Sequence, residues 1–309
     1  MKWIRNYYYF RYLLRIRCKW IWEHLHFQYS KRQMLSCDET NEYLKYLLSK
    51  EEPCMVCRLG ANESFSMRTF EFKNKGKYDK AIQQLCICAG FFPMEADRGN
   101  EFLAVMKDAL KEADMCGTLL QPCDDYFLNK YTDGACKTMQ LSYLVASGYK
   151  KPWTEVLKGK KVLIIHPFAE TIKKQYARRM EVFPDREVMP ECELIVYRAV
   201  QTAAGQMDER YEDWFAALNA MTDDIRQIDF DVALLACGAY GLPLAAKIKK
   251  MGKKAVHIGG GLQIMFGIKG RRWDDNPEVR VMYNDAWVYP SEEETPKGAG
   301  MVEGACYWK

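Results

Sequence analysis

The sequence predicts an α/β fold in which a doubly wound, mainly parallel, Rossmann-like sheet follows an N-terminal amphipathic helix. From about residue 38 onward, short apolar segments of strand length alternate with segments of helical periodicity. No internal repeat, low-complexity linker or change of composition interrupts residues 37–309. This part of the chain is therefore expected to form a single domain.

Residues 1–36 are predicted to form the N-terminal helix, which is basic and aromatic. On a helical wheel Trp3, Tyr7 and Leu14 share one face, while Arg11 and Arg15 lie on another. Either this helix lies in the headgroup region of an anionic membrane through residues 1–30, or it packs on the body of the protein or on a second subunit. Its arginines interrupt every apolar run, so neither a signal peptide nor a membrane span is expected.

The first elements after this helix follow from local patterns. Capping residues in SCDETNEYLKYLLSK precede a leucine repeat and predict a short helix. PCMVCRLG is predicted to be a buried strand ending at Gly60, and helical periodicity returns in NEFLAVMKDALKEA.

The second half of the chain gives a stronger strand and helix alternation. The predicted order is strand 161–166, helix 169–180, strand 192–200, helix 210–228, then strand FDVALLACG, helix LPLAAKIKKMG and strand KKAVHIGGG. Gly252 is expected to stop the last helix, since glycine is favoured just past a helix end. The final three elements form a βαβ unit.

Composition narrows the functional classes. A net charge of +4 with a pI near 8.3 is too mild for a nucleic-acid-binding protein. The 12 cysteines lie in a long chain, several of them inside apolar runs, which indicates a reduced, cytoplasmic protein, peripheral at the inner face of the membrane if the N-terminal helix binds there. Cys54 and Cys57 form a C-x-x-C, but they sit in a predicted buried strand and are interpreted as structural rather than as zinc ligands.

Ligands of parallel sheets bind at the carboxyl ends of the strands. This rule selects the loops RLGANES, HPFAE, CGAYGLP and GGGLQ. Two of them are glycine-rich and are predicted to cradle a diphosphate with backbone amides, although tight packing is the alternative. Neither is G-x-G-x-x-G and no P-loop motif occurs, which argues against a dehydrogenase or a P-loop NTPase.

Cations follow the second glycine-rich loop in HIGGGLQIMFGIKGRRW. Lys269, Arg271 and Arg272 are expected to reach the same strand end, where a guanidinium can bind phosphate through two hydrogen bonds. The alternative is a solvated basic loop. Trp273 would stack on a base or a sugar, or be a buried structural residue.

Two acidic motifs lie at opposite edges of the predicted sheet. Asp229 and Asp231 form a D-x-D at the start of a strand and are interpreted as turn and capping residues. Glu63 lies at the carboxyl edge beside Arg58, where it could act as a general base or a metal ligand. Its structural alternative is a capping carboxylate or a salt bridge with Arg58 or Arg68.

Two segments together resemble a known family. R-L-G-A-N-E, from Arg58 to Glu63, resembles the R-x-G-D-G-E signature of the bacterial GT-D-fold glycosyltransferases, once catalogued as a domain of unknown function. CGAYGLPLAAKIKKMGKKAVHIGGGLQ is similar to that family's nucleotide-binding block, with matching spacing from Gly238 through Gly252 to Gly259. GGGLQIMFGIKGRRW, YNDAWVYP and VEGACYW resemble a branch from bacterial polysaccharide and cell-envelope loci. The resemblance covers roughly residues 50–309.

The resemblance implies a glycosyltransferase of hexosyltransferase class. It would move a sugar from a nucleotide-diphosphate donor to a glycan or lipid-linked acceptor in envelope or capsular polysaccharide synthesis, with no nucleic-acid partner. Arg58 and Glu63 would face the reaction centre. The expected nucleotide and diphosphate ligands are Gly60, Gly238, Tyr240, Gly241, Gly259, Gly260, Gln263, Lys269, Arg271 and Arg272.

The chain departs from the family pattern at the residues that would bind Mn²⁺ or Mg²⁺. The family's aspartate-x-glutamate pair maps to Ala61 and Glu63, and its G-H histidine maps to Gly260. Either the cations at 269–272 replace the metal in neutralising the departing diphosphate, or the activity has changed. The alternative function is a non-catalytic, nucleotide-sugar-binding or assembly partner of a polysaccharide biosynthesis complex.

Overall fold

A single sheet organises the protein, as seen in a computed structural model that describes residues 34–121 and 123–309. Eight strands pair in the order β1-β4-β3-β2-β8-β7-β5-β6, and every pairing is parallel. The predicted parallel α/β sheet is confirmed. The strands are β1 (Met34–Leu35), β2 (Cys54–Arg58), β3 (Met115–Thr118), β4 (Lys137–Gln140), β5 (Lys161–His166), β6 (Glu193–Arg198), β7 (Val232–Leu235) and β8 (Lys254–His257).

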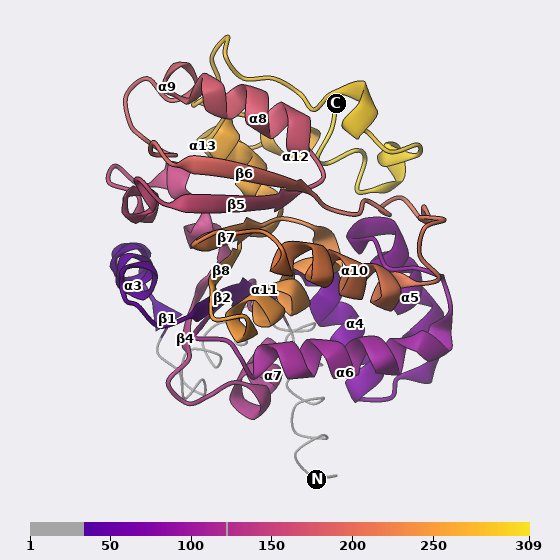
Figure 1. The fold of residues 1–309 in the computed structure, drawn as a ribbon. Helices are drawn as coiled ribbons and strands as arrows, with labels where there is room; N and C mark the ends of the chain where they lie inside the picture. The colour runs from indigo at the N-terminus through magenta and orange to yellow at the C-terminus, as the bar shows by residue number, and fades with distance from the viewer. Residues whose placement is uncertain (1–33, 122) are drawn as a thin grey trace.

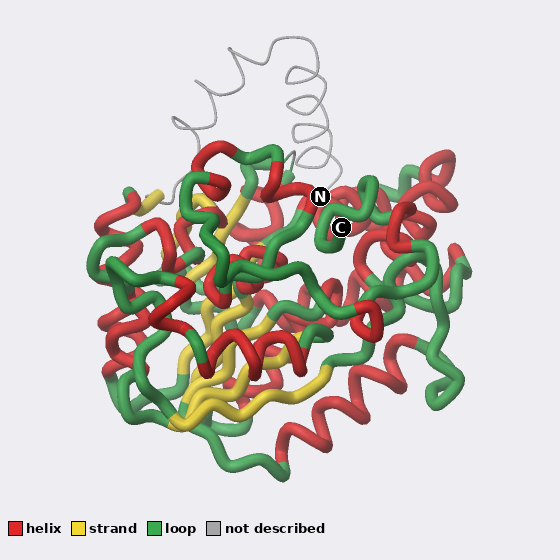
Figure 2. Tube along the Cα trace, turned by 90° about the horizontal axis from the view of Figure 1, so that it is seen from above, coloured by secondary structure: helices red, strands yellow, loops and turns green. Residues whose placement is uncertain are grey.

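Helices cover both faces of this sheet (Figures 1 and 2). One face packs against α4 (Ala61–Glu71), α5 (Tyr78–Ala89), α6 (Gly99–Leu110), α7 (Asp124–Tyr131), α10 (Trp214–Arg226) and α11 (Gly241–Lys250). The other packs against α3 (Cys37–Ser49), α8 (Ala169–Ala177), α9 (Arg179–Val182), α13 (Pro277–Arg280) and the C-terminal segment, with α12 (Arg271–Asp274) beside them. None of the described helices combines the length and apolar composition needed to cross a bilayer.

The two cores follow from the alternation of side chains along each strand. In β2, Met55 and Cys57 enter the core under α4 to α6, while Cys54 and Val56 enter the opposite core. Both cysteines are fully buried, and the described residues contain no group of three or more potential metal-ligating side chains. Side chains alternate along a strand, so Cys54 and Cys57 lie on opposite faces of the sheet and in different cores.

Several element boundaries differ from the predictions. The strand expected to run through the three glycines ends at His257, and Gly259–Phe266 forms the 3₁₀ helix η7. The helix expected from residue 210 begins at Trp214, because the Asp213 carboxylate caps it by accepting a hydrogen bond from the Ala216 N–H at 2.7 Å.

Other elements were not predicted. A loop was expected after Gly60, yet α4 begins at Ala61, and α5, β3, α7 and β4 had no assignment. Met34–Leu35, assigned by sequence to the end of the N-terminal helix segment, form strand β1 beside β4. The remainder of that predicted helix, and its predicted membrane contact, lies outside the described residues.

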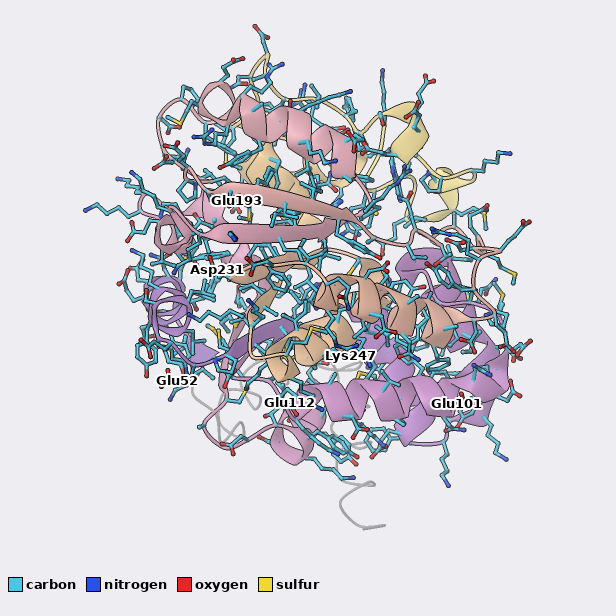
Figure 3. All side chains as sticks on the ribbon, in the orientation of Figure 1. Glu52, Glu101, Glu112, Glu193, Asp231 and Lys247 are labelled. Carbon is cyan, nitrogen blue, oxygen red and sulfur yellow. The ribbon has the colours of Figure 1, made fainter. Side chains whose placement is uncertain are left out.

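The strand order opens a crevice at the carboxyl edge. β2 and β8 are neighbours, and the chain leaves β2 toward the face that carries α4 and leaves β8 toward the opposite face, which is the arrangement of a topological switch point. At the opposite edge, Asp231 accepts a hydrogen bond from the Lys161 N–H at 2.8 Å and Asp229 pairs with the Lys161 ammonium group. Figure 3 shows Asp231 and Glu193 there, at the amino ends of β7 and β6. The predicted structural role of the D-x-D agrees with this position.

Candidate active site

A cavity of about 420 Å³ lies at the carboxyl edge of the sheet. All four loops selected by sequence line it, together with the segment after β6 and the C-terminal residues. Of the predicted site residues, the lining includes Arg58, Glu63, Gly238, Tyr240, Gly260, Gln263 and Arg272. It does not include Gly60, Gly241, Gly259, Lys269 or Arg271.

Arg58 is the last residue of β2, and its guanidinium lies between two glycines. A Cβ atom added to Gly60 would lie within 3.0 Å of Arg58 Nη1, and one added to Gly259 within 3.0 Å of its Nε, Cζ and Nη2. The side chain is half-buried, and its buried Nε has no hydrogen-bond partner. No ion pair joins Arg58 to another residue of the described chain. The cavity wall thus carries a positive charge beside the Glu63 carboxylate, although no ion pair joins the two groups.

Glu63 lies on the other side of Gly60, in the first turn of α4. Its carboxylate is within 3.0 Å of the position of a Cβ on Gly60, and the residue is only 7% exposed. Gly60 supplies no side-chain cap, so the amide groups at this helix end stabilise the carboxylate charge. Among the described residues Glu63 forms no ion pair with Arg58 or with any other cation. Glu63 therefore contributes a buried carboxylate to the residues that line the cavity.

His166 ends β5 and contributes a neutral donor to the same cavity. Its Nδ1 accepts a hydrogen bond from the Phe168 N–H at 2.9 Å, and burial lowers its pKa to about 3. The ring is therefore uncharged near neutral pH and carries its proton on Nε2. Sequence analysis selected the loop HPFAE but did not single out His166; its position at a strand end was the available signal.

Arg272 lines the cavity, but its charge is already compensated. Its guanidinium is paired with Glu303 and donates a hydrogen bond to the Tyr307 hydroxyl at 3.1 Å. The Tyr307 ring lies 4.9 Å from the guanidinium and occupies the space left by the absent side chain of Gly260. Glu303 and Tyr307 were not predicted as site residues, because nothing in their local sequence links them to a strand end.

Lys269 and Arg271, predicted to bind diphosphate with Arg272, lie outside the cavity lining. The Lys269 ammonium is 5.2 Å from the Tyr283 ring and 5.8 Å from the Tyr289 ring. Arg271 is exposed. It and Arg272 begin α12, in which successive side chains point about 100° apart, so only one of them can face the cavity. The charge cluster expected from the sequence is thereby divided.

The predicted glycine cradle is largely occupied by protein groups. A Cβ on Gly238 would meet the carbonyl oxygen of Ala89, and one on Gly241 would meet the His257 ring. Gly238 also has a φ of +58°, which favours glycine there. These glycines permit close packing of elements around the cavity, the structural alternative recognised from sequence.

Gln263 and Tyr240 also have structural contacts. The Gln263 side-chain amide donates to the carbonyl oxygens of Lys269 at 3.0 Å and Ile268 at 3.3 Å, which ties the end of η7 to the following turn. The Tyr240 ring is stacked on Trp214 at 5.1 Å. Both residues line the cavity from positions fixed by these contacts.

Residues 35–265 match the family described as GT-D-like, the GT-D fold-like domain. The chain belongs to the GT-D-like family. The match ends within η7, so Arg272, Glu303 and Tyr307 come from a segment beyond the matched part of this GT-D-like protein.

Two solved structures are also similar to this chain. One, described as the highly conserved domain of unknown function 1792 with a distinct glycosyltransferase fold, is 12% identical, covers 74% of this chain and 79% of its own, and has a TM-score of 0.43. A selenomethionine-substituted structure of the same domain is 11% identical, covers 75% of this chain and 79% of its own, and has a TM-score of 0.42. No curated protein matches the chain.

Proposed function

We propose that this GT-D-like protein is a glycosyltransferase that moves a sugar from a nucleotide-diphosphate donor to an acceptor hydroxyl in the cavity at the carboxyl edge. The observation that carries the proposal is the buried Glu63, which lines the cavity, forms no ion pair with any described residue, and has its carboxylate across Gly60 from Arg58. The fold family supports the same reaction class.

In the proposed transfer, Glu63, His166 and the apolar lining of the cavity have separate roles. Glu63 accepts the proton of the acceptor hydroxyl as its oxygen bonds to the anomeric carbon. The bond from that carbon to the diphosphate breaks, and its electron pair stays on the diphosphate oxygen. His166, neutral and protonated on Nε2, donates a hydrogen bond to a sugar or acceptor oxygen. The apolar part of the lining, including Phe168 and Trp308, excludes water that would otherwise hydrolyse the donor.

The first test is donor binding. Purified protein is screened by thermal shift against UDP, GDP, CDP, TDP and their sugars. A ligand at 100 times its dissociation constant stabilises a fold by about 2.7 kcal/mol. Stabilisation by one nucleotide class identifies the donor. Silence across the panel, from folded protein, contradicts the proposal.

The second test is catalysis by Glu63. With the donor so identified, Glu63→Gln should slow nucleoside diphosphate release to glycan or lipid-linked acceptors by roughly 10²- to 10⁴-fold, because a general base is lost. Glu101→Gln, at an exposed carboxylate of α6 labelled in Figure 3, is the control and should be neutral. Binding without transfer in any acceptor mixture would instead favour the non-catalytic assembly partner, a function to which the substitution of Ala61 for the family aspartate points.

We further propose that the basic, aromatic N-terminal segment brings this enzyme to an anionic membrane surface at the cytoplasmic face, where lipid-linked acceptors of envelope polysaccharides are available. The composition of residues 1–30 supports this. Deletion of these residues should abolish co-sedimentation with phosphatidylglycerol vesicles. Phosphatidylcholine vesicles are the control, and unchanged sedimentation of the deletion variant would refute the membrane role.

A further inference from the structure

The two side-chain cations that line the cavity are in different electrostatic states. Arg272 is held by Glu303 and Tyr307. Arg58 has a buried Nε without a partner and no ion pair within the described chain. A buried donor without a hydrogen-bond partner is costly, so such a group persists where a ligand supplies the acceptor. Arg58 therefore has a free donor for an anionic ligand, although the Glu63 carboxylate lies nearby.

The position of Arg58 is fixed from both sides. Its guanidinium fills the space beside Gly60 and beside Gly259. Gly259 has a φ of +73°, a backbone conformation that residues other than glycine rarely adopt. A guanidinium is a planar fork that can donate two parallel hydrogen bonds to phosphate oxygens. The strands β2 and β8 are neighbours, so Arg58 at the end of β2 lies beside the glycines that follow β8.

The residues present do not fit the divalent metal that the family resemblance implies. Mn²⁺ and Mg²⁺ take oxygen ligands, commonly one or two carboxylates together with substrate phosphates. Ala61 removes one carboxylate of the expected pair, and the described residues include no cluster of three potential ligands. The remaining carboxylate, Glu63, has the guanidinium of Arg58 as its neighbour across Gly60, which repels a cation placed between them.

We propose that Arg58 binds the diphosphate of the donor and replaces the divalent metal, so that the site binds nucleoside diphosphates and releases them without a metal ion. This inference rests on the proposed glycosyl transfer. As the bond between the anomeric carbon and the diphosphate oxygen breaks, the electron pair remains on that oxygen, and the fixed guanidinium stabilises the charge where it develops. In this proposal Arg58, at the end of β2, binds the diphosphate that the sequence assigned to Lys269 and Arg271.

The experiment measures binding of UDP, GDP, CDP and TDP to the full chain by titration calorimetry, in EDTA and in Mn²⁺. We expect at least one diphosphate to bind in EDTA within about twofold of its affinity in Mn²⁺. Arg58→Gln should weaken that binding roughly ten- to hundredfold, since hydrogen bonds to a charged group are lost. Arg58→Lys should fall between, because the charge stays but the fork is lost. Arg271→Gln, on an exposed guanidinium, is the matched control and should bind as the wild type.

The binding results separate the diphosphate site at Arg58 from the proposed catalysis. Binding that disappears in EDTA, or Arg58→Gln and Arg58→Lys variants that bind like the wild type, would overturn it. Metal-independent, Arg58-dependent binding in a protein that transfers no sugar would uphold the diphosphate site while refuting the proposed catalysis. Absence of binding by every diphosphate, in folded protein, overturns both. Circular dichroism of each variant confirms that a loss of binding is not a loss of fold.

Discussion

Replacement of Arg58 by methionine should stabilise the ligand-free protein. In the absence of a ligand the arginine keeps a buried Nε without a hydrogen-bond partner at the cavity wall. Methionine has no donor to satisfy, and its unbranched chain can follow the arginine stem between Gly60 and Gly259. A binding residue is thus expected to reduce stability in the free protein, the trade-off typical of functional sites.

The magnitude follows from two opposing contributions. A buried donor left unsatisfied costs about 1–3 kcal/mol, which the substitution removes. Glu63 then loses the neighbouring positive charge, but the N-terminus of α4 continues to stabilise its carboxylate by up to about 1 kcal/mol. The net expectation is a gain of about 1 kcal/mol. For a chain of this size such a gain raises the melting temperature by about 2 °C.

Differential scanning fluorimetry measures this effect without ligand and with the nucleoside diphosphate that the wild type binds. At 100 times its dissociation constant, that ligand should stabilise the wild type by about 2.7 kcal/mol and leave Arg58→Met unchanged. Arg226→Met, at an exposed arginine of α10, should stay within about 0.5 kcal/mol of the wild type. A lower melting temperature for Arg58→Met, with nucleotide stabilisation intact, would mean that Arg58 is structural and would refute the reasoning.

Three further predictions concern buried groups around the cavity and the sheet. Gly252→Ala, at a φ of +81° with open space around it, should lower the free energy of unfolding by about 1 kcal/mol. Gly259→Ala, at a φ of +73° and against Arg58, should lower it by about 1–3 kcal/mol more. Equal losses of stability in urea titrations would argue against the contact between Gly259 and Arg58. Burial raises the pKa of Asp124 to about 6, so the native state binds its proton more tightly than the unfolded state and stability falls as pH rises from about 4 to 6. Asp124→Asn should therefore gain on the order of 3 kcal/mol at pH 7.5 but nothing near pH 3.5, and a gain independent of pH would contradict this. His166 has the opposite sign: burial lowers its pKa to about 3, so stability is lost as pH falls below about 6.5. His166→Asn should reduce the loss between pH 8 and pH 5 by about 2 kcal/mol, and unfolding curves with an unaltered pH slope would rule out a buried neutral histidine.

The fold could be predicted from sequence where local patterns agree with tertiary packing. Apolar strands such as Lys161–His166 are buried on both faces, so their composition alone identified them. The elements between residues 60 and 140 were missed because their patterns are weaker. β3 contains only four residues, Met115–Thr118, and α4 places Ser64, Ser66 and Thr69 in buried positions where apolar residues are expected. Tertiary contacts, not periodicity, determine these elements.

The edge of the sheet that holds the site was predictable, but the identity of its charged groups was only partly so. The rule for parallel sheets placed Arg58, Glu63 and the loop after His166 at one edge, because the carboxyl ends of parallel strands lie at the same edge of the sheet. It could not separate Arg271 from Arg272, since that depends on where α12 begins. Nor could it find Glu303 and Tyr307, which reach the cavity from the C-terminal segment.

The three successive glycines lie against side chains that are distant in the sequence. Their sequence pattern suggested backbone brought close to an anion, with nearby cations in support. In the structure Gly259 makes room for Arg58, Gly260 for Tyr307 and Gly261 for Val145. Glycine therefore acts here by admitting side chains from other elements, and the first of these is a cation on the neighbouring strand. Because Gly259 and Arg58 occupy one space, a larger residue at Gly259 would have to displace the guanidinium. Diphosphate affinity should consequently fall in Gly259→Ala as well as in Arg58→Gln, which would link the glycine pattern to the anion by way of the arginine.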